Sequence, residues 1–173
     1  MANFLMALGG LVIFSIFSLM TNTSILNNKK IALESEFIIT ATSLAQSVIE
    51  EAKNKTFDQN TVTDTVTVLG SLSSTLGREG TESTNVPLPD VMTNNTFKSA
   101  IYYNDVDDYN GYTRTVNTPY SGNNSVSVQV SYVSETSPDS VSANRTWCKK
   151  MTVAVTSPLI SVPIVITYVF SYP

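Results

Sequence analysis

The sequence predicts an α+β fold in which one long N-terminal helix packs by its second half on a small antiparallel β-sheet. Residues 1–58 contain an uncharged apolar run followed by a stretch with helical spacing, and no proline interrupts them. From residue 61 onward the pattern changes to the alternation that is typical of strands. A helix followed by a block of strands indicates the α+β class. We therefore expect an apolar assembly or membrane helix (1–28), its amphipathic continuation (29–58) and a β-rich globular head (59–173).

The apolar run extends from Phe4 to Met20 (FLMALGGLVIFSIFSLM) and is 17 residues long. Burying one large side chain stabilises by roughly 1.5–3 kcal/mol, so about ten of them supply on the order of 20 kcal/mol. The run is at the lower length limit for a membrane span. Either a bilayer or copies of the same helix must cover it. For assembly with copies, the expected contact residues are Phe4, Leu5, Leu8, Leu11, Val12, Phe14, Phe17 and Leu19.

The charges around this run bear on the topology of the chain. No Lys or Arg precedes the run, which is atypical of a secretory signal peptide. The nearest basic pair, Lys29 and Lys30, lies on its far side and would by itself hold the head in the cytoplasm. We expect that a basic leader is removed before Met1, so that the head is exported.

The second half of the helix has an apolar stripe at helical spacing. The stripe is expected to pack on the sheet and consists of Phe37, Ala41, Leu44, Ala45, Val48 and Ala52. Between the two halves lie Thr21–Ser24 and the pair Asn27 and Asn28, which are poor helix formers. A bend or an unwound turn is expected near residues 20–24.

The C-terminal part alternates between strand patterns and turn residues. The clearest strand is Ser125–Val133, where Val126, Val128 and Val130 share one face. Thr61–Leu69 is a weak strand pattern, and Gly70–Asn95 has the composition of a long surface loop. Further strands are expected at 97–103, 146–156 and 162–172, with a turn at 104–111.

Composition excludes several classes of function. The net charge of −4 and pI near 4.7 argue against nucleic-acid binding. With no histidine in the chain, Ser-His-Asp, Cys-His and His-based metal sites are excluded. The one cysteine, Cys148, cannot form an internal disulfide; it is either a small buried side chain on a strand or an intermolecular bridge. We expect no cofactor.

The acidic turn is the one stretch that offers ligands for a hard cation. Asp105, Asp107 and Asp108, with Asn104 and Asn110, carry oxygen ligands suited to calcium, but their order departs from that of an EF-hand loop. We interpret the stretch as a solvated turn and expect no metal. An enzyme that uses these carboxylates is the least favoured of the functional hypotheses.

Five Asn-x-Ser/Thr sequons make N-glycosylation a further possibility in an exporting compartment. Their asparagines are Asn22, Asn54, Asn94, Asn123 and Asn144.

The order of these parts resembles the type IV pilins and type II secretion pseudopilins, in which an apolar N-terminal helix runs into an amphipathic half and a small β domain. The stretch ATSLAQSVIEEAKNKTFD (41–58) is similar to the helix end of many minor pilin-like subunits. DDYNGY (107–112) and WCKKMTVAVTSP (147–158) are similar to a turn and the penultimate strand of those subunits. The resemblance implies a homo-oligomeric extracellular filament on the cell surface, whose subunits are inserted in the inner membrane before assembly.

The N-terminus departs from the family pattern. The family has a phenylalanine at its first mature residue and a glutamate at the fifth, whereas Met1 and Leu5 stand at these positions here. Registry between subunits would then depend on packing of apolar side chains rather than on a salt bridge. The alternatives are a membrane-anchored extracytoplasmic binding domain and a minor pseudopilin of a secretion system. The use of a filament, such as adhesion or motility, does not follow from the sequence.

Overall fold

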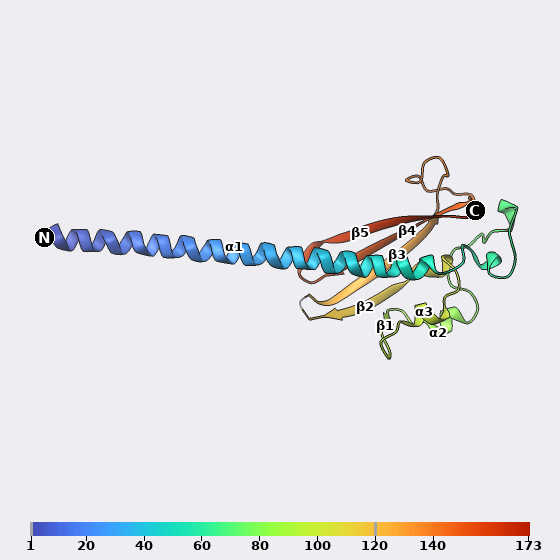
Figure 1. Ribbon diagram of the computed structural model, residues 1–173, viewed down its shortest axis with the longest axis horizontal. Helices are drawn as coiled ribbons and strands as arrows, with labels where there is room; N and C mark the ends of the chain where they lie inside the picture. The colour runs from blue at the N-terminus through green and yellow to red at the C-terminus, as the bar shows by residue number, and fades with distance from the viewer. Residues whose placement is uncertain (1, 120) are drawn as a thin grey trace. The chain divides into compact units, whose positions relative to one another are not determined.

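A computed structural model describes residues 2–119 and 121–173 and confirms the α+β class. A long apolar helix precedes a five-stranded mixed sheet, an arrangement consistent with a pilin-like fold (Figure 1). The chain divides into two compact units, one ending at Phe37 and one comprising Ile38–Pro173. In chain order the elements are α1 (Ala2–Lys53), η1 (Gln59–Thr61), η2 (Leu69–Ser71), α2 (Glu82–Asn85), β1 (Asp90–Val91), α3 (Lys98–Tyr102), η3 (Asp107–Tyr109), β2 (Thr113–Thr118), β3 (Gly122–Tyr132), β4 (Cys148–Ser157) and β5 (Ile160–Ser171).

Helix α1 continues through the stretch where an unwound turn was expected. Residues 20–24 are helical, so that prediction was wrong. The Thr21 hydroxyl donates to the Phe17 carbonyl oxygen at 2.9 Å, and the Thr23 hydroxyl donates to that of Met20 at 2.9 Å. These bonds satisfy the hydroxyl groups without breaking the backbone ladder. The helix ends at Lys53 rather than at residue 58. Directly after this end, the Asn54 side chain donates to the Glu50 carbonyl oxygen at 2.8 Å.

The sheet follows the order of the chain, β1-β2-β3-β4-β5. Strands β2 to β5 pair antiparallel, whereas β1 pairs parallel with β2, so the sheet is mixed rather than purely antiparallel. The three longest strands, β3, β4 and β5, confirm the strands expected from residue 125 onward. The short strands β1 and β2 were not predicted.

Two further expectations were wrong. The stretch 97–103 is not a strand but contains helix α3, because the Asp90 carboxylate accepts the backbone N–H groups of Lys98 at 3.4 Å and Ser99 at 3.0 Å at the helix start. Residues 61–69 form no strand. The carboxylate of Asp58 caps η1 and, by accepting the backbone N–H of Ser73 at 3.0 Å, holds this segment in a loop.

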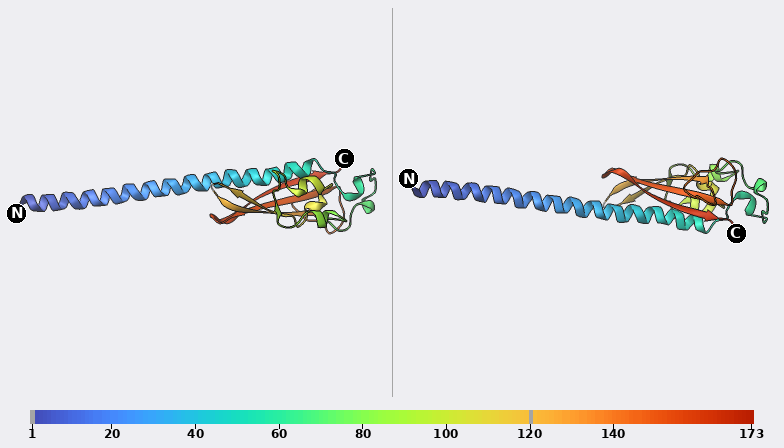
Figure 2. Two further views of the ribbon diagram at one scale, coloured as in Figure 1. Left: turned by 90° about the horizontal axis from the view of Figure 1, so that it is seen from below. Right: turned by 90° about the horizontal axis from the view of Figure 1, so that it is seen from above.

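Within the second unit, the last part of α1 packs across one face of the sheet (Figure 2). The Arg114 guanidinium in β2 donates to the Leu44 carbonyl oxygen at 3.1 Å and lies 3.5 Å from the Glu51 carboxylate. On the other side of the helix, the Lys53 ammonium lies 4.6 Å from the ring centroid of Tyr168 in β5. The buried side chains between helix and sheet are Ala41, Ala45, Val48 and Ala52 of α1, Val126, Val128 and Val130 of β3, and Met151, Val153 and Val155 of β4.

The alternation in β3 leaves the opposite face of the sheet polar. Ser125, Ser127 and Gln129 are exposed between the buried valines. Of the remaining residues expected to pack on the sheet, Phe37 is buried and Leu44 is half-buried.

Candidate functional site

The first half of α1 presents a continuous apolar surface to its surroundings. The eight side chains expected to form the assembly interface are all exposed, by 52% to 72% of their maximal area. They are Phe4, Leu5, Leu8, Leu11, Val12, Phe14, Phe17 and Leu19. Contiguous apolar surface of this extent marks a site of protein or membrane contact.

By length and composition, α1 is a helix that could cross a membrane. The most apolar segment of this helix, 18 residues long, has no buried residue. Some of the hydroxyl groups in and next to this apolar segment donate to carbonyl oxygen atoms of the same helix. The Ser15 hydroxyl donates to the Leu11 carbonyl oxygen at 2.8 Å, as Thr21 does to Phe17. Internal hydrogen bonds of this kind suit a segment that is surrounded by hydrocarbon or by apolar side chains.

The exposed apolar surface continues beyond the uncharged run. Past Met20, the exposed large apolar side chains in the first unit are Ile25, Leu26, Ile31 and Leu33. They lie on both sides of the basic pair Lys29 and Lys30. The apolar surface of α1 is therefore longer than the uncharged run alone.

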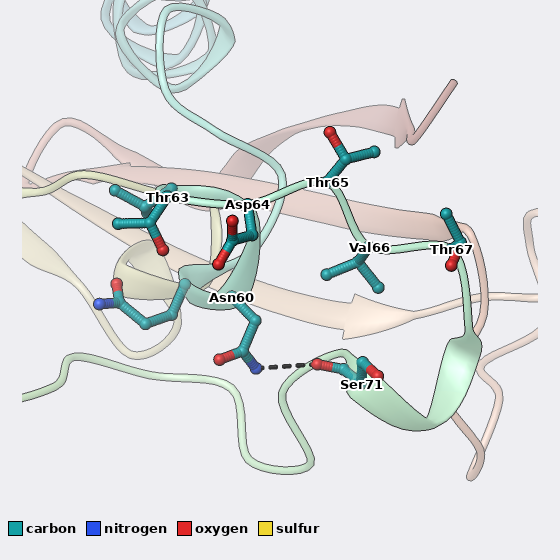
Figure 3. A pocket seen from close by; sticks show the side chains of 9 residues that line it. Asn60, Thr63, Asp64, Thr65, Val66, Thr67 and Ser71 are labelled. Carbon is teal, nitrogen blue, oxygen red and sulfur yellow. Dashed lines mark hydrogen bonds between the residues drawn. The ribbon is translucent and has the colours of Figure 1, made fainter.

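Two hollows of the second unit lie at its surface, one with a mainly polar lining and one with a mainly apolar lining. One of about 520 Å³ is lined within the single stretch 59–71, mainly by polar residues, and Asp64 is its one charged lining residue (Figure 3). A second, of about 570 Å³, lies beside Trp147, Cys148 and Tyr172 near the C-terminus. Cys148 itself is half-buried at the start of β4. Neither hollow gathers a cluster of charged groups.

The acidic turn is buried, so its interpretation as a solvated turn was wrong. Asp105, Asp107 and Asp108 have no exposed area. One Asp105 carboxylate oxygen accepts the backbone N–H groups of Asp107 at 2.6 Å and Asp108 at 3.2 Å, which begins η3. One Asp108 oxygen in turn accepts the backbone N–H of Asn104 at 2.9 Å. The carboxylates are therefore part of the core beneath the end of α1.

A buried lysine, which the sequence analysis did not identify, binds two of the buried carboxylates. Lys149 has no exposed area, and its ammonium lies 2.8 Å from the Asp58 carboxylate and contacts that of Asp107. It also donates to the Phe57 carbonyl oxygen at 2.8 Å. The signal for this was present in the alternation of β4, because Lys149 lies two residues before the inward-facing Met151.

The environment shifts the pKa of these acids in opposite directions. Burial by itself would raise the pKa of Asp58, but the Lys149 ammonium and the backbone N–H groups of Ser73 and Asn60 outweigh it and lower that pKa below its ordinary value. Burial raises the pKa of Asp107 to about 8 even though Lys149 opposes the shift, since Asp105 adds a like charge nearby. Lys149 therefore favours the ionised form of both acids, but the effect of burial is outweighed only at Asp58 and not at Asp107.

A second buried network joins α1 to the loops through Glu51. Its carboxylate accepts the hydroxyl groups of Ser99 at 2.7 Å and Tyr109 at 2.8 Å, in addition to the contact with Arg114. By contrast, the neighbouring Glu50 is exposed and pairs with Lys53. The two glutamates thus face different surroundings, as their consecutive positions on a helix dictate.

All five sequon asparagines have exposed side chains: Asn22, Asn54, Asn94, Asn123 and Asn144. Asn94 has a φ of 52° at a tight turn between the bridged residues Thr93 and Thr96. Glycosylation at these positions stays a prediction.

Comparison of the chain with protein-family models, curated proteins and solved structures finds no match. The features of the protein that bear on its function are the exposed apolar surface of α1 and the buried charged side chains of the head.

Proposed function

We propose that this protein is the structural subunit of an extracellular helical filament, in which the apolar halves of α1 from neighbouring copies pack together. Before assembly, the same apolar half is inserted in a membrane. The heads then cover the outside of the filament. This proposal agrees with the resemblance to type IV pilins and type II secretion pseudopilins noted in the sequence.

The observation that carries the proposal is the length of the exposed apolar surface along α1. At about 1.5 Å per residue, the stretch from Ala2 to Met20 spans roughly 27 Å, close to the roughly 30 Å of a bilayer's hydrocarbon core. Leu33 lies roughly 47 Å from Ala2 along the same helix. A bilayer that covers the first stretch holds Ile25 and Leu26 only at the depth of the headgroups and leaves Ile31 and Leu33 in water, although all four are large and exposed. Staggered copies of the helix can cover both stretches.

A membrane-anchored extracytoplasmic binding domain is the alternative that the membrane-length helix favours. It requires the first stretch to be covered by lipid and gives no role to the second. Substitutions in the two stretches therefore separate the hypotheses.

Electron microscopy of the purified full chain, after removal of detergent, tests the proposal. Wild-type chains should form filaments. Both Phe14→Asp and Leu33→Asp should abolish them, because each places a carboxylate in the apolar interface of every subunit, at a cost of several kcal/mol per copy. The matched control is Asn27→Asp, which adds the same charge at an exposed polar position of the same helix.

Salt provides a second arm of the test. Raising it to about 1 M shortens the Debye length to roughly 3 Å, yet filaments should persist because apolar contacts are not screened. Chains that remain monomeric in detergent and never polymerise, or Leu33→Asp chains that assemble normally, would favour the membrane anchor.

A further inference from the structure

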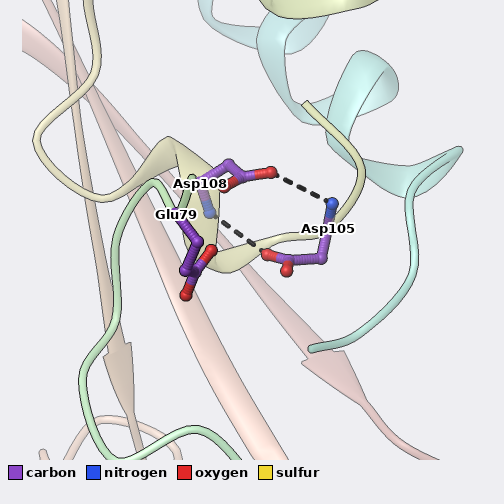
Figure 4. A group of neighbouring side chains, drawn as sticks. All are labelled: Glu79, Asp105 and Asp108. Carbon is purple, nitrogen blue, oxygen red and sulfur yellow. Dashed lines mark hydrogen bonds between the residues drawn. The ribbon is translucent and has the colours of Figure 1, made fainter. Parts of the chain in front are cut away.

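Three carboxylates converge beside η3, and we call them the acidic cluster: Glu79, Asp105 and Asp108. Glu79 comes from the loop before α2, whereas Asp105 and Asp108 lie on either side of the start of η3 (Figure 4). One oxygen atom from each carboxylate lies within 4.8 Å of the others. Because Ca²⁺–oxygen distances are about 2.3–2.6 Å, two ligands on opposite sides of one calcium ion are about 4.6–5.2 Å apart. The spacing of the acidic cluster therefore fits a single ion.

One oxygen atom of each carboxylate in the acidic cluster lacks a hydrogen-bond partner. Asp105 and Asp108 are fully buried, and each uses one oxygen for backbone N–H groups while Asp105 Oδ2 and Asp108 Oδ1 have no partner. Glu79 Oε2 and Asn104 Oδ1 are also buried without a partner. Buried polar atoms are almost always satisfied in folded proteins, and each one left without a partner is costly. Buried oxygen atoms left without partners in the acidic cluster indicate a missing positive ligand.

The charge of the cluster is not balanced by the protein. Among the salt bridges of the described residues, none reaches Glu79, Asp105 or Asp108. The buried ammonium of Lys149 is bound by Asp58 and Asp107. Glu82, whose carboxylate accepts the Glu79 backbone N–H at 3.0 Å, adds a further acid beside the cluster. Unpaired buried carboxylates require either protons or a cation.

We propose that the acidic cluster is a binding site for a calcium ion, held by Glu79, Asp105 and Asp108. Donor atoms that are all oxygen select hard cations. Calcium accepts six to eight such ligands with flexible geometry, whereas magnesium needs oxygen atoms at about 2.0–2.1 Å, at most roughly 4.2 Å apart. Glu79 also lines a surface hollow of about 400 Å³, which gives the site a route to solvent and to water ligands. The ion would tie the loop before α2 to η3.

Calcium titration of the full chain in detergent micelles tests this site without depending on filament formation. After treatment with EDTA and dialysis, isothermal titration calorimetry at pH 7.5 should show one calcium ion per chain. At a calcium concentration of about one hundred times the dissociation constant, the unfolding midpoint should rise by roughly 5–10 °C. Magnesium should bind far more weakly. Absence of calcium binding would overturn the proposal by leaving protons as the counter-charge, and equal binding of both ions would overturn the assignment to calcium.

Single variants locate the ion. Asp108→Asn keeps the size of the side chain and should weaken calcium binding at least tenfold, and Glu79→Gln should do the same from a half-buried loop position where folding is tolerant. The matched control, Asp139→Asn, removes an exposed acid from another loop and should leave binding unchanged. Near-ultraviolet circular dichroism verifies that each variant is folded. Wild-type affinity in both Asp108→Asn and Glu79→Gln would place the ion elsewhere and overturn the proposal.

Discussion

At the scale of single residues, Lys149 is the cation on which the interior of the head depends. It is fully buried on β4 and binds two carboxylates that come from other parts of the chain, Asp58 and Asp107. Its ammonium also lies 4.4 Å from the ring centroid of Phe57 and 5.1 Å from that of Tyr132. The desolvation cost of this group is therefore offset by two charges, a carbonyl oxygen and two aromatic faces.

Replacing Lys149 by methionine should destabilise the chain by about 3–5 kcal/mol, because the buried Asp58 carboxylate loses its counter-charge and Asp107 loses a buried hydrogen-bond donor, while the packing volume is largely kept. Urea unfolding in detergent micelles, followed by the fluorescence of the single Trp147, measures the change. Lys150→Met, on the opposite face of the same strand, should change stability by less than about 0.5 kcal/mol. Equal effects of the two substitutions would contradict the importance of the buried pairs.

Without divalent cations, stability should fall as pH rises from about 5 to about 9. Burial raises the pKa of Asp105 to about 6 and, with Asp105 nearby, that of Glu79 to about 7; burial together with Glu82 raises that of Asp108 to about 9. Unfolded carboxyl groups titrate near pH 4, so in this window the folded state holds more protons than the unfolded state. The free energy of unfolding therefore decreases as pH rises, and it stops decreasing above the pKa of Asp108, the highest of the three in the folded state. Lys149 opposes the shift of Asp105, whereas Asp58 adds to it.

Urea midpoints in EDTA at pH 5, 7 and 9 test this dependence. They should decrease in that order, and the decrease should be smaller in Asp108→Asn, which lacks the acid with the highest of these three pKa values. Asp58, whose pKa is lowered, is ionised in both states across this range and does not contribute to the slope. A midpoint that rises with pH would contradict the assignment.

The sequence predicted these residues only in part. The acidic residues of the turn at 104–111 identified oxygen ligands, but turn composition indicated exposure, because acidic turns are usually solvated. Burial depended on contacts with Glu79 and with Lys149, which lie far away in the sequence, and no local pattern in the turn encodes them. The alternation of β4 contained the one local clue, an inward-facing Lys149.

At the scale of elements, the face that the second half of α1 buries against the sheet is made mostly of small side chains. Ala41, Ala45 and Ala52 have no exposed area, and the Arg114 guanidinium reaches the Leu44 carbonyl oxygen over this face. Arg114 also lies 4.4 Å from the ring centroid of Phe97, so the charged group is stacked as well as hydrogen-bonded.

Enlarging one of these alanines should therefore push the helix from the sheet. Ala45→Leu inserts side-chain carbon atoms into a filled space and should cost about 1–3 kcal/mol in stability. The matched control is Gln46→Leu, one residue further on the exposed face of the same helix, which should have little effect. The difference in urea midpoint between these two variants measures the closeness of packing, and a tolerated Ala45→Leu would contradict it.

Helices and strands with a regular repeat of apolar residues were predicted from the sequence. Those that depend on contacts with residues distant in the sequence were not. Strands β3 and β4 alternate clearly between valine and polar residues, and α1 has a long apolar pattern. Strand β2 lacks such alternation because Arg114 occupies an inward position, where it binds Glu51. Helix α3 has β-branched and aromatic residues that favour a strand, but its first turn is capped by Asp90.

At the scale of the whole molecule, the chain combines a unit that exposes apolar surface with a unit that has its own core. The second unit begins at Ile38 and includes the part of α1 that packs on the sheet. The apolar half of α1 is therefore not required for the core of the head.

Deleting residues 1–28 should give a soluble monomer with the strands intact. The remaining helix keeps Ala41, Ala45, Val48 and Ala52, which cover the sheet. Circular dichroism and light scattering check the result. Deleting residues 1–58 should instead expose the apolar face of the sheet and cause aggregation. A truncated chain from residue 29 that is unfolded or still polymerises would show that assembly and folding are not divided in this way.

The position of Lys149, after both of its acidic partners in the sequence, has a consequence for the time course of folding. Sheet neighbours follow one another in sequence, and such local pairings form quickly. The bonds from Lys149 to Asp58 and Asp107, however, span 91 and 42 residues. Both acids are synthesised long before their partner, and they remain hydrated until β4 arrives and closes over them. A nascent chain that stops before β4 therefore cannot close its interior, and Asp58, just past the end of α1, gains its counter-charge only after β4 is synthesised.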